Sequence, residues 1–287
     1  MAEPLRILSI GAHPADIFDQ SGGTMAHHVD RGDQVGCAVL THGARVHDAV
    51  ISEEMFHRKE VPTGAELESI MAERSDVKAE ETRKACGILG VEDVTFFGAD
   101  DGVILITPET VKRLAKLLRE KRPDIILTHF PREGDGLTSS HAVSGQIVSH
   151  AMAHAASVDP GDPHPPHRVA SVFYFGAGAA TVRSSLWDAD GGYYNDVFID
   201  ISDVVEKKLA ALDCLVSQGY SGAYARKRIE SSDGAFGTAA GVAYAEGFIS
   251  AASETHYHLP VSDYSLQKAR SSDFEVMNRY SKRIVID

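Results

Sequence analysis

Short apolar runs alternate with longer polar segments along the first half of the chain. The first run, Leu5–Ile10, is bounded by Pro4 and Gly11 and is typical of a buried β-strand. The same pattern predicts further strands at Gln34–Leu40, Asp93–Phe97, Asp124–Thr128, Val169–Phe175 and Val197–Ile201.

Helical segments separate these strands. The glycine-rich stretch Ser21–Thr24 leads into a helix that ends near Arg31, and a strong helix over Asp76–Leu89 ends at Gly90. Residues 43–75 are polar and only weakly periodic, so we expect either a long active-site loop or a mobile insertion there. Further helices are predicted at Pro108–Lys121, Ser139–Ala156, Asp203–Leu215 and Gly222–Ser231, followed by a polar tail with no clear element.

This order of elements indicates an α/β fold. Short, wholly apolar strands alternating with helices predict a Rossmann-like, mostly parallel sheet with helices on both faces. The length of 287 residues fits one domain, with a core at about 5–158 and a C-terminal lobe at about 168–287 that extends the fold over the site. Ligands of such sheets bind beyond the carboxyl ends of the strands, so we look for chemistry after the first, second and fourth strands.

Composition narrows the function classes. The formal net charge of −13 argues against a nucleic-acid partner, yet it allows a small anionic substrate held in a local basic pocket. No apolar run approaches the length of a membrane span, and the three scattered cysteines suggest no disulfide framework. We therefore expect a cytoplasmic homo-oligomer with a small-molecule partner and no membrane partner.

Metal-ligating residue types follow two of the predicted strands. His13 and Asp16 lie three residues apart in the turn after the first strand, and imidazole with carboxylate suits zinc. Taken alone, such a pair is more often a coincidence within a turn. His141, however, begins the helix that follows the fourth strand, beyond the carboxyl end of a neighbouring strand. We expect these three side chains to hold one Zn²⁺ per chain, or another divalent metal, with a coordination position left open for catalysis.

The segment Ile7–Thr24 (ILSIGAHPADIFDQSGGT) resembles the opening of the PIG-L/LmbE family of zinc-dependent deacetylases, which shows A-H-P-D-D-E after its first strand. The segments Leu89–Val91 (LGV) and Tyr244–Phe248 (YAEGF) are also similar to family landmarks. The resemblance covers about residues 5–250. It implies an LmbE-like fold and the same three metal ligands.

The family pattern is broken at the positions that carry its hydrolytic chemistry. Ala15 replaces the aspartate that usually acts as general base, a role worth about 10²–10⁴-fold in rate. Thr138 stands where the family's H-P-D-H motif has its first histidine, and Lys78 corresponds to a frequent arginine. A smaller branch of the family, resembling 4-oxalomesaconate hydratase, also has alanine in place of the base.

Resemblance to that branch implies a zinc-dependent hydratase, a lyase that adds water to a small anionic unsaturated keto acid in aromatic catabolism. Two alternatives stay open. One is a zinc-dependent N-deacetylase, a hydrolase of an N-acetyl sugar or related amide, which most of the family favours and Ala15 opposes. The other is a catalytically silent metal-binding protein.

Candidate acid–base groups lie mainly in the segment after the second strand, where the hydratase branch has a glutamate. This chain reads Thr-His-Gly-Ala-Arg-Val-His-Asp from position 41. His42, His47 and Asp48 are therefore candidate proton-transfer residues, and Thr138 is a further catalytic candidate.

Candidate substrate-binding groups are the nearby cations Arg45, Lys78 and Arg132, because guanidinium and ammonium groups bind carboxylates. His129, directly after the fourth strand, is a fourth candidate. For the basic run 226–228 a solvated helix face is the better explanation. Gly22 and Gly23 lack the spacing of a phosphate loop, so we expect them to serve tight packing.

Overall fold

The computed structural model describes residues 3–132, 139–175 and 195–284. These residues form a seven-stranded sheet in the order β3-β2-β1-β4-β5-β7-β6. β1 to β5 pair in parallel, whereas β7 is antiparallel to both β5 and β6, so the mostly parallel Rossmann-like sheet is confirmed. The strands are β1 Arg6–Gly11, β2 Gln34–Thr41, β3 Asp93–Ala99, β4 Ile125–Thr128, β5 Ser171–Phe175, β6 Val197–Asp200 and β7 Ala245–Ser250.

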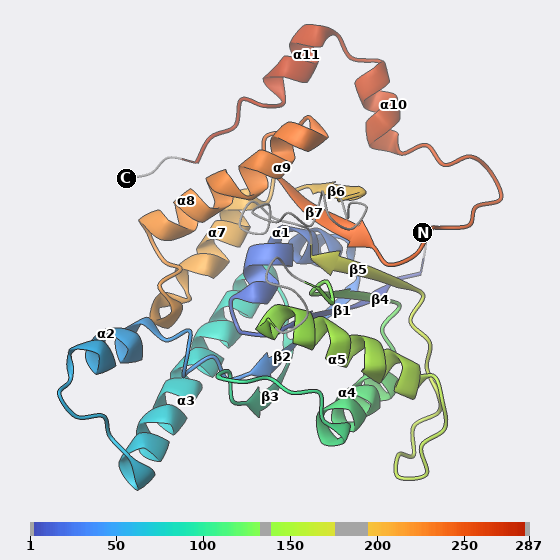
Figure 1. The fold of residues 1–287 in the computed structure, drawn as a ribbon. Coiled ribbons are helices and arrows are strands. Elements are labelled where there is room, and N and C mark those ends of the chain that lie inside the picture. The colour runs from blue at the N-terminus through green and yellow to red at the C-terminus, as the bar shows by residue number, and fades with distance from the viewer. Residues whose placement is uncertain (1–2, 133–138, 176–194, 285–287) are drawn as a thin grey trace.

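Helices cover both faces of this sheet (Figure 1). One face packs on α1 (Asp16–Arg31), α3 (Gly64–Leu89) and α7 (Val205–Asp213), and the other packs on α4 (Pro108–Lys121) and α5 (Ser140–Ala155). The strands supply alternate side chains to the two layers: in β1, Ile7 joins the α1 side and Leu8 joins the α4 side. The remaining helices of the described residues are α2 (Ala49–His57), η1 (Val216–Gln218), α8 (Ala223–Ser231), α9 (Asp233–Ala240), α10 (Asp263–Ala269) and α11 (Asp273–Asn278).

The glycine-rich stretch lies inside α1, which begins earlier than predicted, at Asp16. A Cβ on Gly23 would lie 2.5 Å from Ile201, and one on Gly22 would lie 3.1 Å from Lys208. The glycines therefore permit close packing of α1 against the segment after β6 and against α7. Tight packing was the correct expectation for them, and treating them as a helix boundary was wrong.

The predicted long loop at 43–75 is also corrected by the structure. It contains α2 and the first turns of α3, which runs without interruption from Gly64 to Leu89. Only the last part of α3 is buried, through residues such as Lys78, Ala85 and Leu89. The exposed first part has no apolar stripe, so its sequence shows little helical periodicity.

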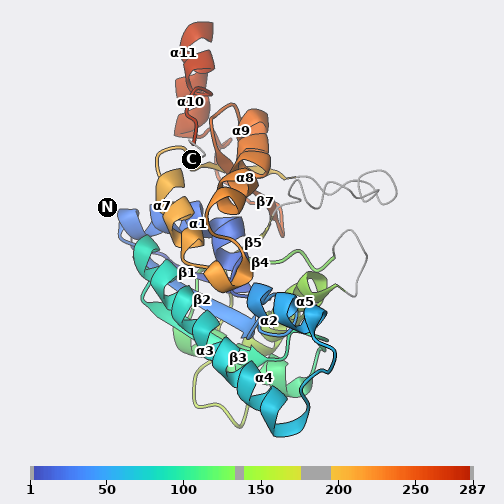
Figure 2. The ribbon, with the colours of Figure 1, turned by 90° about the vertical axis from the view of Figure 1, so that its left-hand side faces the viewer.

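The C-terminal third contributes more structure than the polar tail suggested. Its strand β7 (AEGFIS) inserts between β5 and β6 and is almost wholly buried. Beyond it, α10 and α11 bury no residue and project away from the body of the molecule (Figure 2). None of the described helices is both long and apolar enough to cross a membrane.

A buried group of charges joins α1 to this C-terminal part. Lys208 Nζ lies 2.7 Å from Asp233 Oδ2 and 2.8 Å from Glu246 Oε1, and it donates to the carbonyl of Asp19 at 2.7 Å. Burial alone would lower the pKa of Lys208, but Asp233, Glu246 and Asp19 raise it. Arg228 makes a two-pronged ion pair with the Asp19 carboxylate. The expectation of a solvated face at 226–228 was therefore wrong for Arg228, whose side chain is 18% exposed and bound to Asp19.

Candidate active site

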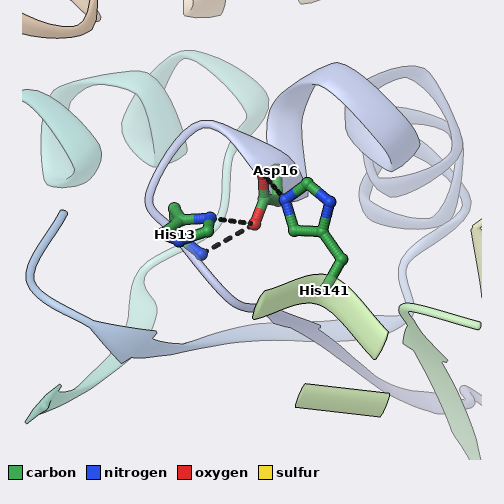
Figure 3. Close-up of side chains that lie close together, drawn as sticks. All are labelled: His13, Asp16 and His141. Carbon is green, nitrogen blue, oxygen red and sulfur yellow. Dashed lines mark hydrogen bonds and ion pairs between the residues drawn. The ribbon is translucent and has the colours of Figure 1, made fainter. Parts of the chain in front are cut away.

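The turn between β1 and α1 carries the first two predicted metal ligands. The Asp16 carboxylate folds back and accepts a hydrogen bond from the His13 backbone N–H at 2.7 Å. The turn is anchored to β2, because Thr41 donates to the Ala12 carbonyl from both its backbone N–H and its hydroxyl. As a result His13 Nδ1 lies 3.3 Å from Asp16 Oδ2 (Figure 3).

The third predicted ligand comes from the start of α5. The Ser139 hydroxyl accepts from the Ala142 N–H and caps this helix. One turn further along, a Cβ on Gly145 would lie 2.3 Å from the His129 carbonyl oxygen, so only glycine allows α5 to approach the end of β4 this closely. His141 Nε2 lies 3.6 Å from Asp16 Oδ1 (Figure 3).

Residues His13, Asp16 and His141 each present a ligand atom within 4.8 Å of the others. Both ring nitrogens of His13 are buried, and neither makes a hydrogen bond within the described structure. Burying such atoms without hydrogen bonds costs free energy, and a cation among the three side chains would remove that cost. Burial opposes ionisation of Asp16, but His141, His129 and His13 lower its pKa well below the usual value. An anionic oxygen beside two imidazoles fits a divalent metal ion.

His129 lies directly behind this group. Its Nε2 is 3.1 Å from the Ala12 amide nitrogen and 3.0 Å from Asp16 Oδ2, so it accepts from the amide in one tautomer or donates to the carboxylate in the other. Its ring stacks on that of His141 at a centroid distance of 4.4 Å. Burial lowers the pKa of His129, and the charge of His141 lowers it further. The structure places this predicted substrate-binding residue against two of the three candidate metal ligands, Asp16 and His141, and outside the cavity wall.

A cavity of about 290 Å³ opens beside these three side chains. His47 lines it, and its ring centroid lies 4.0 Å from that of His13. Burial lowers the pKa of His47, and the charge of His13 lowers it further. Three polar wall residues escaped the sequence analysis: Ser52, Gln218 and Tyr220. No motif or periodicity connects Gln218 and Tyr220 to the first strand, so no signal in the sequence could have found them.

Asp48 touches the cavity but is already occupied as a hydrogen-bond acceptor. It caps α2 by accepting from the Ile51 N–H at 2.8 Å, and Arg74 Nε lies 3.0 Å from its other oxygen. Lys78 Nζ is 3.4 Å from the same carboxylate. A carboxylate held in this way stabilises α2 and α3, and the structure gives no geometry in which it exchanges a proton with a ligand in the cavity.

Lys78 is buried rather than directed into the cavity. Its ammonium donates to the His47 carbonyl and to the Ser217 hydroxyl, each at 3.0 Å. Burial lowers the pKa of Lys78, while Asp48 opposes that change. The predicted substrate cation thus fixes the backbone of a cavity residue.

His42 and Arg45 lie outside the cavity wall. Asp101, two residues beyond β3, accepts from the backbone N–H groups of Arg45 and Val46, and its Oδ1 is 3.2 Å from His42 Nδ1. The Arg45 guanidinium pairs with Asp100 at 2.6 Å, and this contact raises the pKa of Arg45. These contacts shape the loop that carries His47.

Two further candidates lie at the edge of the described structure. Arg132 is partly buried just beyond β4 and is not part of the cavity wall. Thr138 falls outside the described residues.

Comparison with known proteins agrees with this architecture. The profile of the PIG-L family, described as GlcNAc-PI de-N-acetylase, matches residues 8–152, about half of the chain. The 4-oxalmesaconate hydratase of Pseudomonas putida is 27% identical over 213 residues, which cover 74% of this chain and 73% of that protein. The diacetylchitobiose deacetylase of Thermococcus kodakarensis is 27% identical over 221 residues, covering 74% of this chain and 70% of the relative.

A solved structure shows the same fold. The crystal structure of the 4-carboxy-2-hydroxymuconate hydratase of Pseudomonas putida superposes with a TM-score of 0.67 and 22% identity, over 89% of this chain and all of that one. The resemblance first suggested by His13, Asp16 and the strand before them thus extends over the sheet and its helices. The chain belongs to the PIG-L family.

Proposed function

We propose that this chain is a zinc-dependent hydratase, which adds water across the C=C bond of a small anionic unsaturated keto acid. Support comes from the 4-oxalmesaconate hydratase relative and from the three converging side chains of His13, Asp16 and His141. Zinc held by them would supply a Lewis acid that polarises an oxygen of the substrate.

The observation that carries the proposal is the lack of an available carboxylate base. Among the described residues that line the cavity, the carboxylates are Asp16 and Asp48. Asp16 faces the histidines, and Asp48 is held by Arg74 and the cap of α2. Ala15, at the position of the deacetylase base, contributes only a methyl group. Hydration of a conjugated C=C bond has no amine to expel, so it tolerates this loss better than amide hydrolysis does.

His47 is the proposed acid–base residue, because it is the cavity imidazole that is not assigned to the metal. Its ring would take a proton from water as the water oxygen attacks one carbon of the C=C bond. It would then return the proton to the neighbouring carbon. One C–O bond and one C–H bond form, and the π bond is lost.

Amide hydrolysis is the alternative, favoured by the deacetylases among the relatives. Substituting Ala15→Asp tests it, because a carboxylate restored beside His13 would supply the missing base. A large gain in deacetylation of an N-acetyl sugar by this variant would identify a deacetylase site that lacks its base, and would count against the hydratase.

The direct test is an assay of zinc-loaded protein with 4-oxalmesaconate. The reaction is monitored through the ultraviolet absorbance of the conjugated system, which hydration removes. We expect turnover that disappears when the metal is removed with a chelator and returns when zinc is added. Fully metal-loaded protein that leaves 4-oxalmesaconate and related unsaturated keto acids unchanged would contradict the proposal.

A further inference from the structure

Gln218, from the C-terminal part of the chain, contacts the turn between β1 and α1 that carries His13 and Asp16. It ends η1, and its Oε1 accepts a hydrogen bond from the backbone N–H of Ala15 at 3.2 Å. Its side chain also lines the cavity, together with His13 and His47. Gln218 therefore lies beside the position that carries no carboxylate in this chain.

The nitrogen of the Gln218 amide has no hydrogen-bond partner among the described residues. This atom, Nε2, is buried. An amide nitrogen of this kind has two N–H donors, and leaving them unpaired in a buried position costs free energy. Apart from Gln218, His13 is the cavity residue whose buried side-chain nitrogens lack hydrogen bonds in the described structure, and there a ligand is expected.

The neighbouring residue fixes the position of this amide. Ser217 donates its hydroxyl to Glu81 Oε2 at 2.6 Å, and Glu81 Oε1 accepts from its backbone N–H at 2.9 Å. Lys78 Nζ donates to the Ser217 hydroxyl as well. Because Ser217 is buried and bound on three sides, the side chain of Gln218 is presented to the cavity from a rigid support.

We propose that Gln218 Nε2 donates a hydrogen bond to a carboxylate or keto oxygen of the substrate, while its Oε1 still accepts from the backbone N–H of Ala15. The identity of the ligand as a keto acid rests on the proposed function, whereas the role of Gln218 as an oxygen-binding donor rests on its own contacts. Gln218 is thus a substrate-binding residue that the C-terminal part of the chain supplies to the site.

The test compares Gln218→Glu and Gln218→Met with the wild-type holoprotein. The Glu variant keeps an oxygen for the Ala15 N–H but has no donor, and the Met variant is neutral and has neither. 2-Oxoglutarate serves as a non-reacting keto acid, with its dissociation constant measured by calorimetry on protein of known zinc content. We expect the dissociation constant to rise about tenfold or more in both variants, because a donor to a charged oxygen is lost. The zinc content should stay unchanged. Gln267→Glu, the same change on exposed α10, serves as the control and should bind as wild type does.

Each result decides the inference. The inference would be overturned if both variants bound 2-oxoglutarate with wild-type affinity, or if the wild-type protein did not bind it. Weaker binding by the Glu variant alone would also overturn it, because that result would indicate charge repulsion. If 4-oxalmesaconate is not hydrated but 2-oxoglutarate binding falls in both variants, the proposed reaction fails and the inference about Gln218 stands.

Discussion

Two buried polar groups contact the first turns of α1, one around Asp16 and the other around Lys208, whose ammonium binds the Asp19 carbonyl. They differ in how completely their polar atoms are paired. Around Lys208, the ammonium has three oxygen partners, and the Glu246 carboxylate accepts from the backbone N–H groups of Gly23 and Thr24 at 2.8 and 2.7 Å. Around Asp16, by contrast, both ring nitrogens of His13 remain without hydrogen bonds in the described structure. A fully paired group is a structural element, and an incompletely paired one is arranged for a ligand.

The contrast also explains how the C-terminal part serves the site. Lys208, Asp233 and Glu246 hold it against α1 through charges that never reach the cavity. Gln218 and Tyr220 come from the same part of the chain and do reach the cavity. The paired group thus helps to set the position of two residues that line the cavity.

Removing a metal ligand should have the largest effect. Asp16→Ala or His141→Ala should lower bound zinc to a small fraction of one per chain and reduce activity to background, because two protein ligands rarely retain the ion. Metal analysis of the purified variants measures this. His154→Ala, on the same helix α5 and outside the cavity, is the control and should keep its metal. Stoichiometric zinc in the Asp16 and His141 variants would refute the ligand assignment.

Removing the proposed acid–base group should lower turnover and spare the metal. For His47→Ala we expect kcat to fall about 10²–10⁴-fold, the usual contribution of a general acid–base residue, with zinc content unchanged. Steady-state kinetics on metal-loaded protein measures the change. A kcat within threefold of wild type would show that another residue moves the proton.

Breaking the paired group should change stability rather than chemistry. Lys208→Met leaves Asp233 and Glu246 buried without their cation, so we expect a loss of about 3–5 kcal/mol in the free energy of unfolding. Urea denaturation of this variant beside Lys207→Met gives a matched pair, because Lys207 makes only a more exposed ion pair with Asp30, worth about 0–1 kcal/mol. Equal losses in the two variants would contradict the structural role of Lys208.

The smallest effect is expected at Lys78, which binds the backbone of the cavity residue His47 but does not itself line the cavity. Lys78→Met removes the hydrogen bond to the His47 carbonyl, while Arg74 still pairs with Asp48. We expect kcat to fall about tenfold, corresponding to about 1.4 kcal/mol, with KM and zinc content nearly unchanged. Lys84→Met, on the exposed side of α3, provides the control. A large rise in KM with unchanged kcat would instead support Lys78 as a substrate-binding residue.

The sequence was sufficient where local pattern and topology decide the structure. Pro108–Lys121 was predicted to the residue, because α4 combines an N-terminal proline with an apolar stripe. His13, Asp16 and His141 were found because strand ends of a parallel sheet meet at one edge. Distant contacts were beyond its reach: α1 carries a glycine at position 23 because Ile201 leaves no room for a Cβ there, and Gln218 lies beside Ala15 because Ser217 binds α3.

The most direct test of the metal centre is anomalous X-ray diffraction at the zinc absorption edge, from crystals of the protein loaded with one equivalent of zinc. The expected result is a single strong peak in contact with the side chains of His13, Asp16 and His141, with His47 facing it across the cavity. Full zinc loading with no peak at these three residues, or with the peak elsewhere in the molecule, would contradict the account.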